Sequence, residues 1–204
     1  PAPYREPVMQ ALASEEDLEP HVFFCSDREP DRQWRLAASS YPRTVLKESF
    51  FTVRGRFIHI NPDVIGALAR FDPHVVVTTG FNPTHLLAFA YARLRARAHV
   101  AMTDGTLASE RRLTGLHRAV RRTVFRGSHA FIGASDGSRR LYESYGIEPG
   151  AIFRSALCAD NERFRPRAPG QKRIDLLFCG RLVDVKNPVF ALEVARGASR
   201  RLGR

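Results

Sequence analysis

The chain has 204 residues, of which 44% are hydrophobic and 26% charged, and its 32 Lys and Arg against 21 Asp and Glu give a formal net charge of +11. This composition is that of a globular protein and excludes a chain too polar to form a core. No apolar run approaches the roughly 20 residues that span a bilayer. The positive charge favours a polyanionic partner, such as nucleic acid, an anionic membrane surface or a phosphorylated small molecule. Three cysteines without a C-x-x-C pair indicate neither a zinc site nor a redox motif and suit a reducing, cytoplasmic setting.

Short apolar runs typical of buried strands recur along the chain. They are bounded by Pro, Gly or polar residues and are too short for helices. Residues 26–56 are polar and leave room for one or two further short strands. The predicted strands are HVFFC (21–25), HVVVTTG (74–80), HVAMT (99–103), HAFIG (129–133), AIFRSA (151–156) and IDLLFCG (174–180).

Amphipathic helices are predicted between these strands. Asn-Pro pairs at 61–62, 82–83 and 187–188 mark three helix starts, because Asn is a good cap and Pro suits the first helical turn. Ser135 is expected to cap a further helix. Strands that alternate with helices predict a doubly wound, Rossmann-like α/β domain whose parallel sheet is covered by helices on both faces.

The alternation of strands and helices is interrupted once, near residue 158. Residues 158–173 are polar and contain two prolines and one glycine, a composition typical of a linker. We therefore expect an N-terminal domain over 1–157 and the beginning of a second domain over 174–204. One strand and one helix are too little for a separate core, so the second domain is expected to be truncated.

Four candidate site residues lie in the first domain, where strands are predicted to end. Ligands of parallel α/β sheets bind at the carboxyl ends of the strands, and this rule selects Thr79, Asn82, Asp104 and Ser135. For the last three, a second interpretation is favoured, in which the side chain only caps the helix that follows.

A second set of candidates lies in FCGRLVDVKNP, at 179–189. Gly180 lets the backbone approach a ligand, Arg181 offers a planar fork for phosphate oxygens, and Lys186 offers a mobile charge. Together the two cations could neutralise a diphosphate, whose negative charge grows as it departs in a transfer reaction. The competing interpretation is an exposed loop with two unrelated cations.

The segment IDLLFCGRLVDVKNP resembles the G-R-L-x-x-x-K-N-P segment of family-4 retaining glycosyltransferases of the GT-B fold. Three further segments are similar to that family in order and spacing: FDPHVVVTTG, GSHAFIGASDGSRRLYESYGIEPGAIF and CADNERFRP. The resemblance covers most of residues 60–195. It implies two Rossmann-like domains, of which the first binds an acceptor and the second a nucleotide-sugar donor.

The resemblance also implies residue roles. Gly180, Arg181 and Lys186 would contact the donor diphosphate, and Thr79, Asn82 and Ser135 would line the acceptor side of the cleft. Many members carry a His where this chain has Asp104, which makes Asp104 the catalytic candidate. Protein cations would take the place of a metal ion, and no other cofactor is implied. The family's first strand would precede residue 1 and its donor-binding glutamates would follow residue 204, so the 204 residues alone are expected to be inactive.

One helix is predicted over SERRLTGLHRAVRRTVFR, at 109–126, with an apolar face and an arginine-rich face. Because the family's acceptors are often lipid-linked, the arginine face is predicted to bind the inner surface of a membrane, in polysaccharide or glycolipid synthesis. The simpler interpretation is a helix packed on the sheet with a solvated basic face. Two other functions stay open: nucleic-acid binding, which the absence of a recognised module disfavours, and a non-catalytic interaction module of the same fold. The predicted membrane contacts are Arg111, Arg118, Arg121, Arg122 and Phe125.

Overall fold

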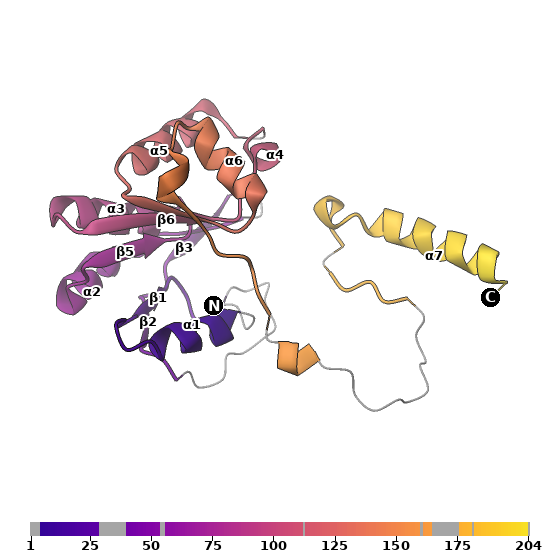
Figure 1. Ribbon diagram of the computed structural model, residues 1–204, viewed down its shortest axis with the longest axis horizontal. Helices are drawn as coiled ribbons and strands as arrows, with labels where there is room; N and C mark the ends of the chain where they lie inside the picture. The colour runs from indigo at the N-terminus through magenta and orange to yellow at the C-terminus, as the bar shows by residue number, and fades with distance from the viewer. Residues whose placement is uncertain are drawn as a thin grey trace. The chain divides into compact units, whose positions relative to one another are not determined.

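The computed structural model describes residues 5–28, 40–53, 56–111, 113–159, 161–164, 176–180 and 182–203 (Figure 1). The chain divides into two compact units, Pro1–Asp160 and Asn161–Arg204. The division falls inside the stretch 158–173 that the sequence predicts to be a linker.

The first unit alternates strands and helices over most of its length, as the sequence predicts. Two short β pairs precede this alternation: the first joins a strand at 22–24 to one at 43–45, and the second lies at 50–59. The elements are α1 (Glu6–Ala13), β1 (Val22–Phe24), β2 (Arg43–Val45), β3 (Phe50–Val53), β4 (Arg56–His59), α2 (Asp63–Phe71), β5 (Val75–Thr78), α3 (Pro83–Leu94), β6 (Ala98–Thr103), α4 (Leu107–Glu110), α5 (Gly115–Arg126), β7 (Ala130–Gly133), α6 (Asp136–Ser144), η2 (Pro149–Ala151) and β8 (Ile152–Arg154).

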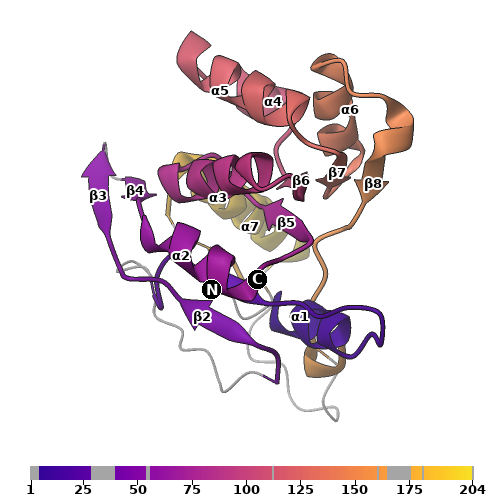
Figure 2. The ribbon, with the colours of Figure 1, turned by 90° about the vertical axis from the view of Figure 1, so that its left-hand side faces the viewer.

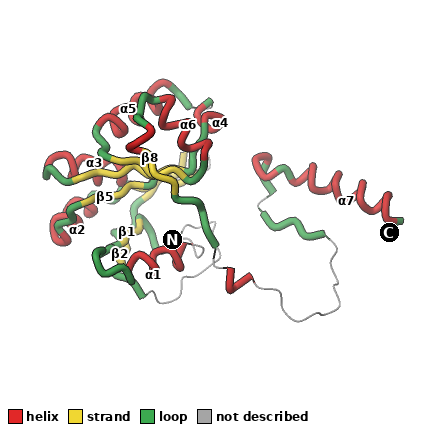
Figure 3. The backbone as a smooth tube through the Cα atoms, viewed as in Figure 1, coloured by secondary structure: helices red, strands yellow, loops and turns green. Residues whose placement is uncertain are grey.

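A four-stranded parallel sheet is the centre of this unit. Its strand order is β5-β6-β7-β8, and every neighbouring pair is parallel. Figure 3 shows the strands of the sheet in yellow. Two smaller pairs accompany it: β1 and β2 are parallel, whereas β3 and β4 form the antiparallel hairpin seen in Figure 2. The chain is therefore an α/β protein with a parallel sheet, which confirms the coarser part of the predicted fold.

The two faces of the sheet differ in burial. On β5, Val76 and Thr78 are buried, whereas Val75 and Val77 are 49% and 51% exposed. Phe153 on β8 is 59% exposed. Successive side chains of a strand point to opposite faces, so one face is packed and the other is open at both edge strands. The prediction of a fully buried strand at 74–80 is therefore wrong, because Val75 and Val77 are about half exposed.

The packed face carries two hydrophobic clusters. One joins β5 to α2, α3 and the segment after β2, through Val76, Leu68, Tyr91 and Leu46. The other joins β6 and β7 to α5 and α6; its buried members are Ala101, Val124, Phe125, Phe131 and Tyr142. Figure 1 shows α5 and α6 together on one side of the sheet. Two members of the second cluster, Ala101 and Phe131, stand two residues before the ends of β6 and β7.

Asn61 does not cap α2, contrary to the sequence prediction. The cap position is Pro62, which has no side-chain capping bond. The Asn61 amide instead donates to the carbonyl oxygens of Cys25, at 2.9 Å, and Lys47, at 2.6 Å, and accepts from the Thr84 hydroxyl at 2.7 Å. Asn61 is fully buried, so its side chain links three distant segments instead of starting a helix.

The helix predicted over 109–126 is two helices. The first, α4, ends at Glu110, and α5 begins at Gly115 behind a cap made by Thr114, whose hydroxyl accepts from the His117 amide at 3.5 Å. Glycine costs about 1 kcal/mol in a helix interior relative to Ala. Placing Gly115 at the first helical position, behind a threonine cap, avoids that cost.

The second unit contains η3 (Asn161–Phe164), η4 (Asp184–Lys186) and α7 (Pro188–Leu202). The predicted helix start at Asn187-Pro188 is confirmed. The predicted strand at 174–180 is not formed over 176–180, the part of it that the structure describes. Leu177 is 75% exposed. A strand needs a paired neighbour for its backbone groups, and no strand is present among the described residues of this unit.

Candidate functional site

The parallel strands end along one edge of the sheet, because all four run in the same direction. The last residues of β5, β6, β7 and β8 are Thr78, Thr103, Gly133 and Arg154. The loops that leave this edge lead into α3, α4, α6 and the second unit. Such an edge is where α/β sheets bind ligands, and the predicted residues Thr79, Asp104 and Ser135 all lie on it.

A pocket opens at the ends of β5, β6 and β7 and brings Thr79 together with Asp104. Both side chains are exposed, and Asp104 makes no hydrogen bond or ion pair with the residues that the structure describes. The pocket therefore combines an available carboxylate with threonine hydroxyls. Its lining residues are Arg5, Thr79, Met102, Thr103, Asp104, Ala134 and Leu157.

Asp104 is not the cap of the following helix. That position belongs to Thr106, whose amide donates to the Ser109 hydroxyl at 3.0 Å in a reciprocal capping box. The turn before it is held by the Gly105 amide, which donates to the Thr103 hydroxyl oxygen at 3.0 Å. The cap interpretation of Asp104 is therefore wrong, and its carboxylate stays on the pocket wall.

Asn82 and Ser135 do cap helices, which confirms the favoured interpretation. The His85 amide donates to Asn82 Oδ1 at 3.0 Å, and the Ser138 amide donates to Ser135 Oγ at 3.3 Å. Asn82 lines neither of the two pockets found at this edge. Ser135 lines the second pocket, so this residue both caps α6 and forms part of the pocket wall.

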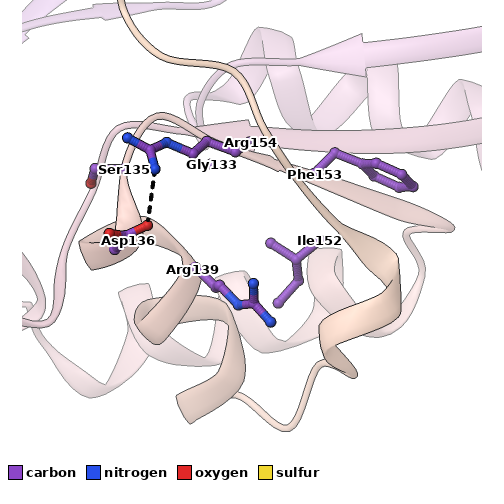
Figure 4. A pocket seen from close by; sticks show the side chains of 7 residues that line it. All are labelled: Gly133, Ser135, Asp136, Arg139, Ile152, Phe153 and Arg154. Carbon is purple, nitrogen blue, oxygen red and sulfur yellow. Dashed lines mark hydrogen bonds and ion pairs between the residues drawn. The ribbon is translucent and has the colours of Figure 1, made fainter.

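The second pocket lies between β7, β8 and the first turn of α6 (Figure 4). Its arginines already have acidic partners: Arg154 contacts Asp136 at 3.4 Å, and Arg139 contacts Glu143 at 2.9 Å. A ligand here would compete with those carboxylates. The lining residues are Gly133, Ser135, Asp136, Arg139, Ile152, Phe153 and Arg154.

Arg5 is the charged residue of this pocket that sequence reasoning missed. It stands immediately before α1, far along the chain from the strand ends that it joins. A single arginine beside Glu6 and Pro7 belongs to no motif. No pattern within the sequence could have found it, because its position depends on how α1 packs.

A buried polar network lies behind the strand ends. His99 is fully buried on β6, where its Nδ1 lies 2.8 Å from Ser128 Oγ and its Nε2 lies 3.1 Å from Thr78 Oγ1. Ser128 donates its own proton to Val124 O, so it accepts from Nδ1–H, and Nε2 accepts from Thr78. Burial, together with the charge of nearby His129, lowers the pKa of His99 to about 4.

We expect acid to destabilise the first unit through His99. The folded-state pKa lies below the ordinary value of about 6.5, so the unfolded chain takes up the proton first as the pH falls. The contribution of neutral His99 to the free energy of unfolding is complete above about pH 6.5 and is lost between about pH 6.5 and 4. For this buried group the contribution is on the order of 1–3 kcal/mol. His85, whose pKa burial also lowers to about 4, adds in the same direction.

Urea denaturation of wild type and His99→Gln at pH 7 and pH 4.5 measures this effect. The variant should lose less stability than wild type between the two pH values, because it lacks the titrating ring. Identical pH dependences in the two proteins would show that His99 does not contribute.

The predicted membrane face of α5 is partly wrong. Phe125 is 3% exposed and belongs to the second hydrophobic cluster. Arg121 is bound to Glu110 at 2.9 Å, and its guanidinium lies 4.3 Å from the Phe81 ring centroid. Arg111, Arg118 and Arg122 are exposed. The exposed basic face of this region is therefore narrower than predicted. Arg121 is paired with Glu110, and Phe125 belongs to the core and not to the surface.

In the second unit, the loop before α7 brings Gly180 and Lys186 close together. A Cβ atom built on Gly180 would lie 3.9 Å from Lys186 Cγ. Lys186 is exposed at the end of η4, and Asn187 follows it with φ at +49°, in the left-handed region. Arg181, the other predicted diphosphate contact, lies outside the described residues.

Neither a metal site nor a membrane-spanning helix is found among the described residues. Within the described ranges, no group of three His, Cys, Asp or Glu side chains is placed to hold a metal ion. In the same part of the chain, no helix is long and apolar enough to cross a membrane.

No protein-family model matches the chain, and no curated protein sequence matches it. The candidate site therefore stands on its own geometry and on the segments quoted above.

Proposed function

We propose that the chain belongs to a retaining glycosyltransferase of the GT-B type, with a Rossmann-like acceptor domain in the first unit and part of a Rossmann-like donor domain in the second. The observation that carries this proposal is the pocket shared by Thr79 and Asp104. Its hydroxyl and carboxylate groups suit the hydroxyls of a sugar, and its place at the carboxyl edge is the usual ligand position of parallel α/β sheets.

The donor in this proposal is a nucleotide sugar bound through its diphosphate. Lys186 and Arg181 neutralise the departing diphosphate, and Gly180 leaves room for it beside Lys186. Asp104 contacts the transferred sugar or the attacking hydroxyl. The acceptor is a glycan or lipid-linked glycan, and the product belongs to cell-surface polysaccharide or glycolipid synthesis.

A transfer assay tests the proposal. The complete protein, incubated with a panel of labelled nucleotide sugars and with glycan and lipid-linked acceptors, should move label from at least one donor to an acceptor. Asp104→Asn should reduce this transfer. Failure of every donor in the panel would contradict the proposed function.

Membrane binding through the exposed arginines of the α4–α5 region is the second part of the proposal. Arg111, Arg118 and Arg122 are exposed, and each basic residue near an anionic leaflet contributes roughly 1 kcal/mol. No acidic residue lies in α5 to offset these charges. The protein in this proposal acts at the cytoplasmic surface of the membrane, where lipid-linked acceptors are found.

We expect the protein to sediment with anionic vesicles and to dissociate as salt rises, because exposed charges are screened over about 8–10 Å at physiological ionic strength. The double variant Arg111→Glu, Arg122→Glu should abolish sedimentation. The control is Arg70→Glu, Arg95→Glu, which changes the net charge equally at exposed positions on α2 and after α3 and should still bind. Equal effects of the two double variants, or stronger binding to duplex DNA than to vesicles, would argue against a membrane site on α5.

A further inference from the structure

We infer that Arg121 is a positioning residue for the pocket at the ends of β5, β6 and β7. It holds the loop that carries Thr79 in place against the segment that carries Asp104. The inference rests on the proposed function, because it concerns how the acceptor side of the same site keeps its shape. It gives Arg121 a role inside the first unit instead of the predicted membrane contact.

Arg121 makes two contacts, one with each of these segments. Its Nε lies 2.9 Å from Glu110 Oε1, and its Cζ lies 4.3 Å from the centroid of the Phe81 ring. Phe81 stands two residues after Thr79, in the loop between β5 and α3. Glu110 is the last residue of α4 and stands six residues after Asp104, in the segment that joins β6 to α5. One guanidinium on α5 therefore contacts both segments that bring polar side chains to the pocket.

The ion pair is largely buried. The side chains of Arg121 and Glu110 are 18% and 10% exposed, so salt and water screen the pair weakly. The other carboxylate oxygen, Glu110 Oε2, accepts from the Tyr145 hydroxyl at 2.8 Å. Glu110 is thus fixed between α5 and the end of α6. Without its arginine it would be a buried carboxylate with an uncompensated charge, so we expect α4 to move when the pair is broken.

The two contacts together require an arginine. A guanidinium is planar, so its edge can bond a carboxylate while its face lies over an aromatic ring. A lysine ammonium is a point charge on a flexible stem. It could pair with Glu110 but would lose the planar contact with Phe81. Substitution by lysine therefore separates the two contacts.

The pair of Arg139 and Glu143 on α6 is a matched control. Its Nε–Oε1 distance is also 2.9 Å, but its side chains are 52% and 36% exposed and lie four residues apart on one helix. Such exposed pairs contribute little to stability, and this one joins no second segment. Arg139→Gln changes the net charge by the same amount as Arg121→Gln.

Hydrogen exchange of the 204-residue chain, followed by mass spectrometry, tests the inference without any substrate. In Arg121→Gln, amide exchange should rise about tenfold or more in both 79–82 and 104–114, the change expected when one charge-assisted contact is lost. Residues 134–138, between β7 and α6, open locally without Arg121, so their exchange should stay within about twofold of wild type. Arg139→Gln should leave all three segments near wild type.

Arg121→Lys completes the test. It should raise exchange in 79–82, where the contact with Phe81 is lost, and change 104–114 by less than about threefold, because a charge partner for Glu110 is kept. Circular dichroism checks that each variant is folded, and Arg121→Lys carries the test if Arg121→Gln is not. The inference is overturned if Arg121→Gln loosens only one of the two segments, if 134–138 loosens equally, or if Arg121→Lys leaves 79–82 unchanged.

Steady-state kinetics of the complete protein separate this inference from the proposed function. Arg121→Lys should lower kcat/KM for the acceptor by about tenfold. The donor KM should stay within about twofold of wild type, because the proposed donor site lies in the second unit. Normal transfer together with unchanged exchange in the Arg121 variants would uphold the glycosyltransferase and overturn the role of Arg121. Loosening of both segments without transfer from any donor would do the reverse.

Discussion

Phe125→Ala is expected to lower the free energy of unfolding by about 3–5 kcal/mol, the usual cost of emptying a buried phenylalanine site. Phe125 is 3% exposed, and its ring makes edge-on contacts with the rings of Phe81, Tyr142 and Tyr145 at centroid distances of 5.7, 5.2 and 5.0 Å. These rings come from the β5–α3 loop and from α6 and its end, so the cavity would open where several elements meet.

Leu116→Ala on the same helix is the matched control. Leu116 is 74% exposed, and its truncation should change the free energy of unfolding by no more than about 0.5 kcal/mol. Urea denaturation of both variants, with vesicle sedimentation of the same samples, separates core from membrane roles. If Phe125→Ala unfolded like wild type and lost vesicle binding, Phe125 would be a surface contact as the sequence predicts.

The Asn-Pro pairs show how far local sequence could predict this fold. The pattern occurs at 61–62, 82–83 and 187–188, and a helix follows each pair. Only Asn82 caps its helix with its side chain. Asn61 is occupied by three bonds to distant segments, and Asn187 has a left-handed backbone. Local sequence therefore predicted where helices begin, but tertiary contacts decided what each asparagine does.

The positions of the strands could also be predicted from local sequence, but the burial of each strand face could not. The runs at 74–80 and 99–103 became β5 and β6, because short apolar runs bounded by breakers favour extended backbone. The open face at Val75 and Val77 could not be foreseen, since apolar residues on both sides of a strand indicate burial on both faces. Whether a helix actually covers each face depends on the whole topology.

Only part of the candidate site could be predicted from the sequence. Thr79 and Asp104 followed from the rule that ligands bind where parallel strands end, and the structure places them in one pocket. Arg5 reaches that pocket from the other end of the unit's sequence. Arg121 was predicted to be exposed because its helical position lies among other arginines, but the buried carboxylate of Glu110 pairs with it. Both cases depend on a contact between segments that no periodicity reveals.

If the proposed function holds, Lys186→Ala is expected to weaken both donor binding and turnover. Removing a hydrogen bond to a charged group costs about 1.5–3 kcal/mol, which corresponds to a roughly tenfold to hundredfold loss in kcat/KM. The loss should include kcat, because the diphosphate gains negative charge as it leaves. Folding should be unaffected, since the Lys186 side chain is exposed. The hydrogen bond that the Lys186 backbone amide donates to the Val183 carbonyl does not need the side chain. Arg181→Ala is expected to act in the same way.

Asp184→Ala is the control within the same loop. Asp184 is exposed at the start of η4, and its carbonyl accepts from the Asn187 amide at 2.9 Å, a bond that the substitution retains. The variant removes a negative charge where Lys186→Ala removes a positive one. Donor kinetics for Asp184→Ala should therefore stay within about twofold of wild type or improve slightly, because a diphosphate is favoured by the loss of a nearby carboxylate.

Steady-state kinetics of sugar transfer by wild type, Lys186→Ala and Asp184→Ala, with varied nucleotide-sugar donor, decide whether the loop before α7 is a diphosphate site. We predict a loss of about tenfold or more in kcat/KM for Lys186→Ala, with kcat lowered as well, and near-normal values for Asp184→Ala. If Lys186→Ala matched wild type in both parameters, or if the wild-type protein transferred no sugar from any donor, the proposal of a glycosyltransferase with its donor site at Lys186 would be contradicted.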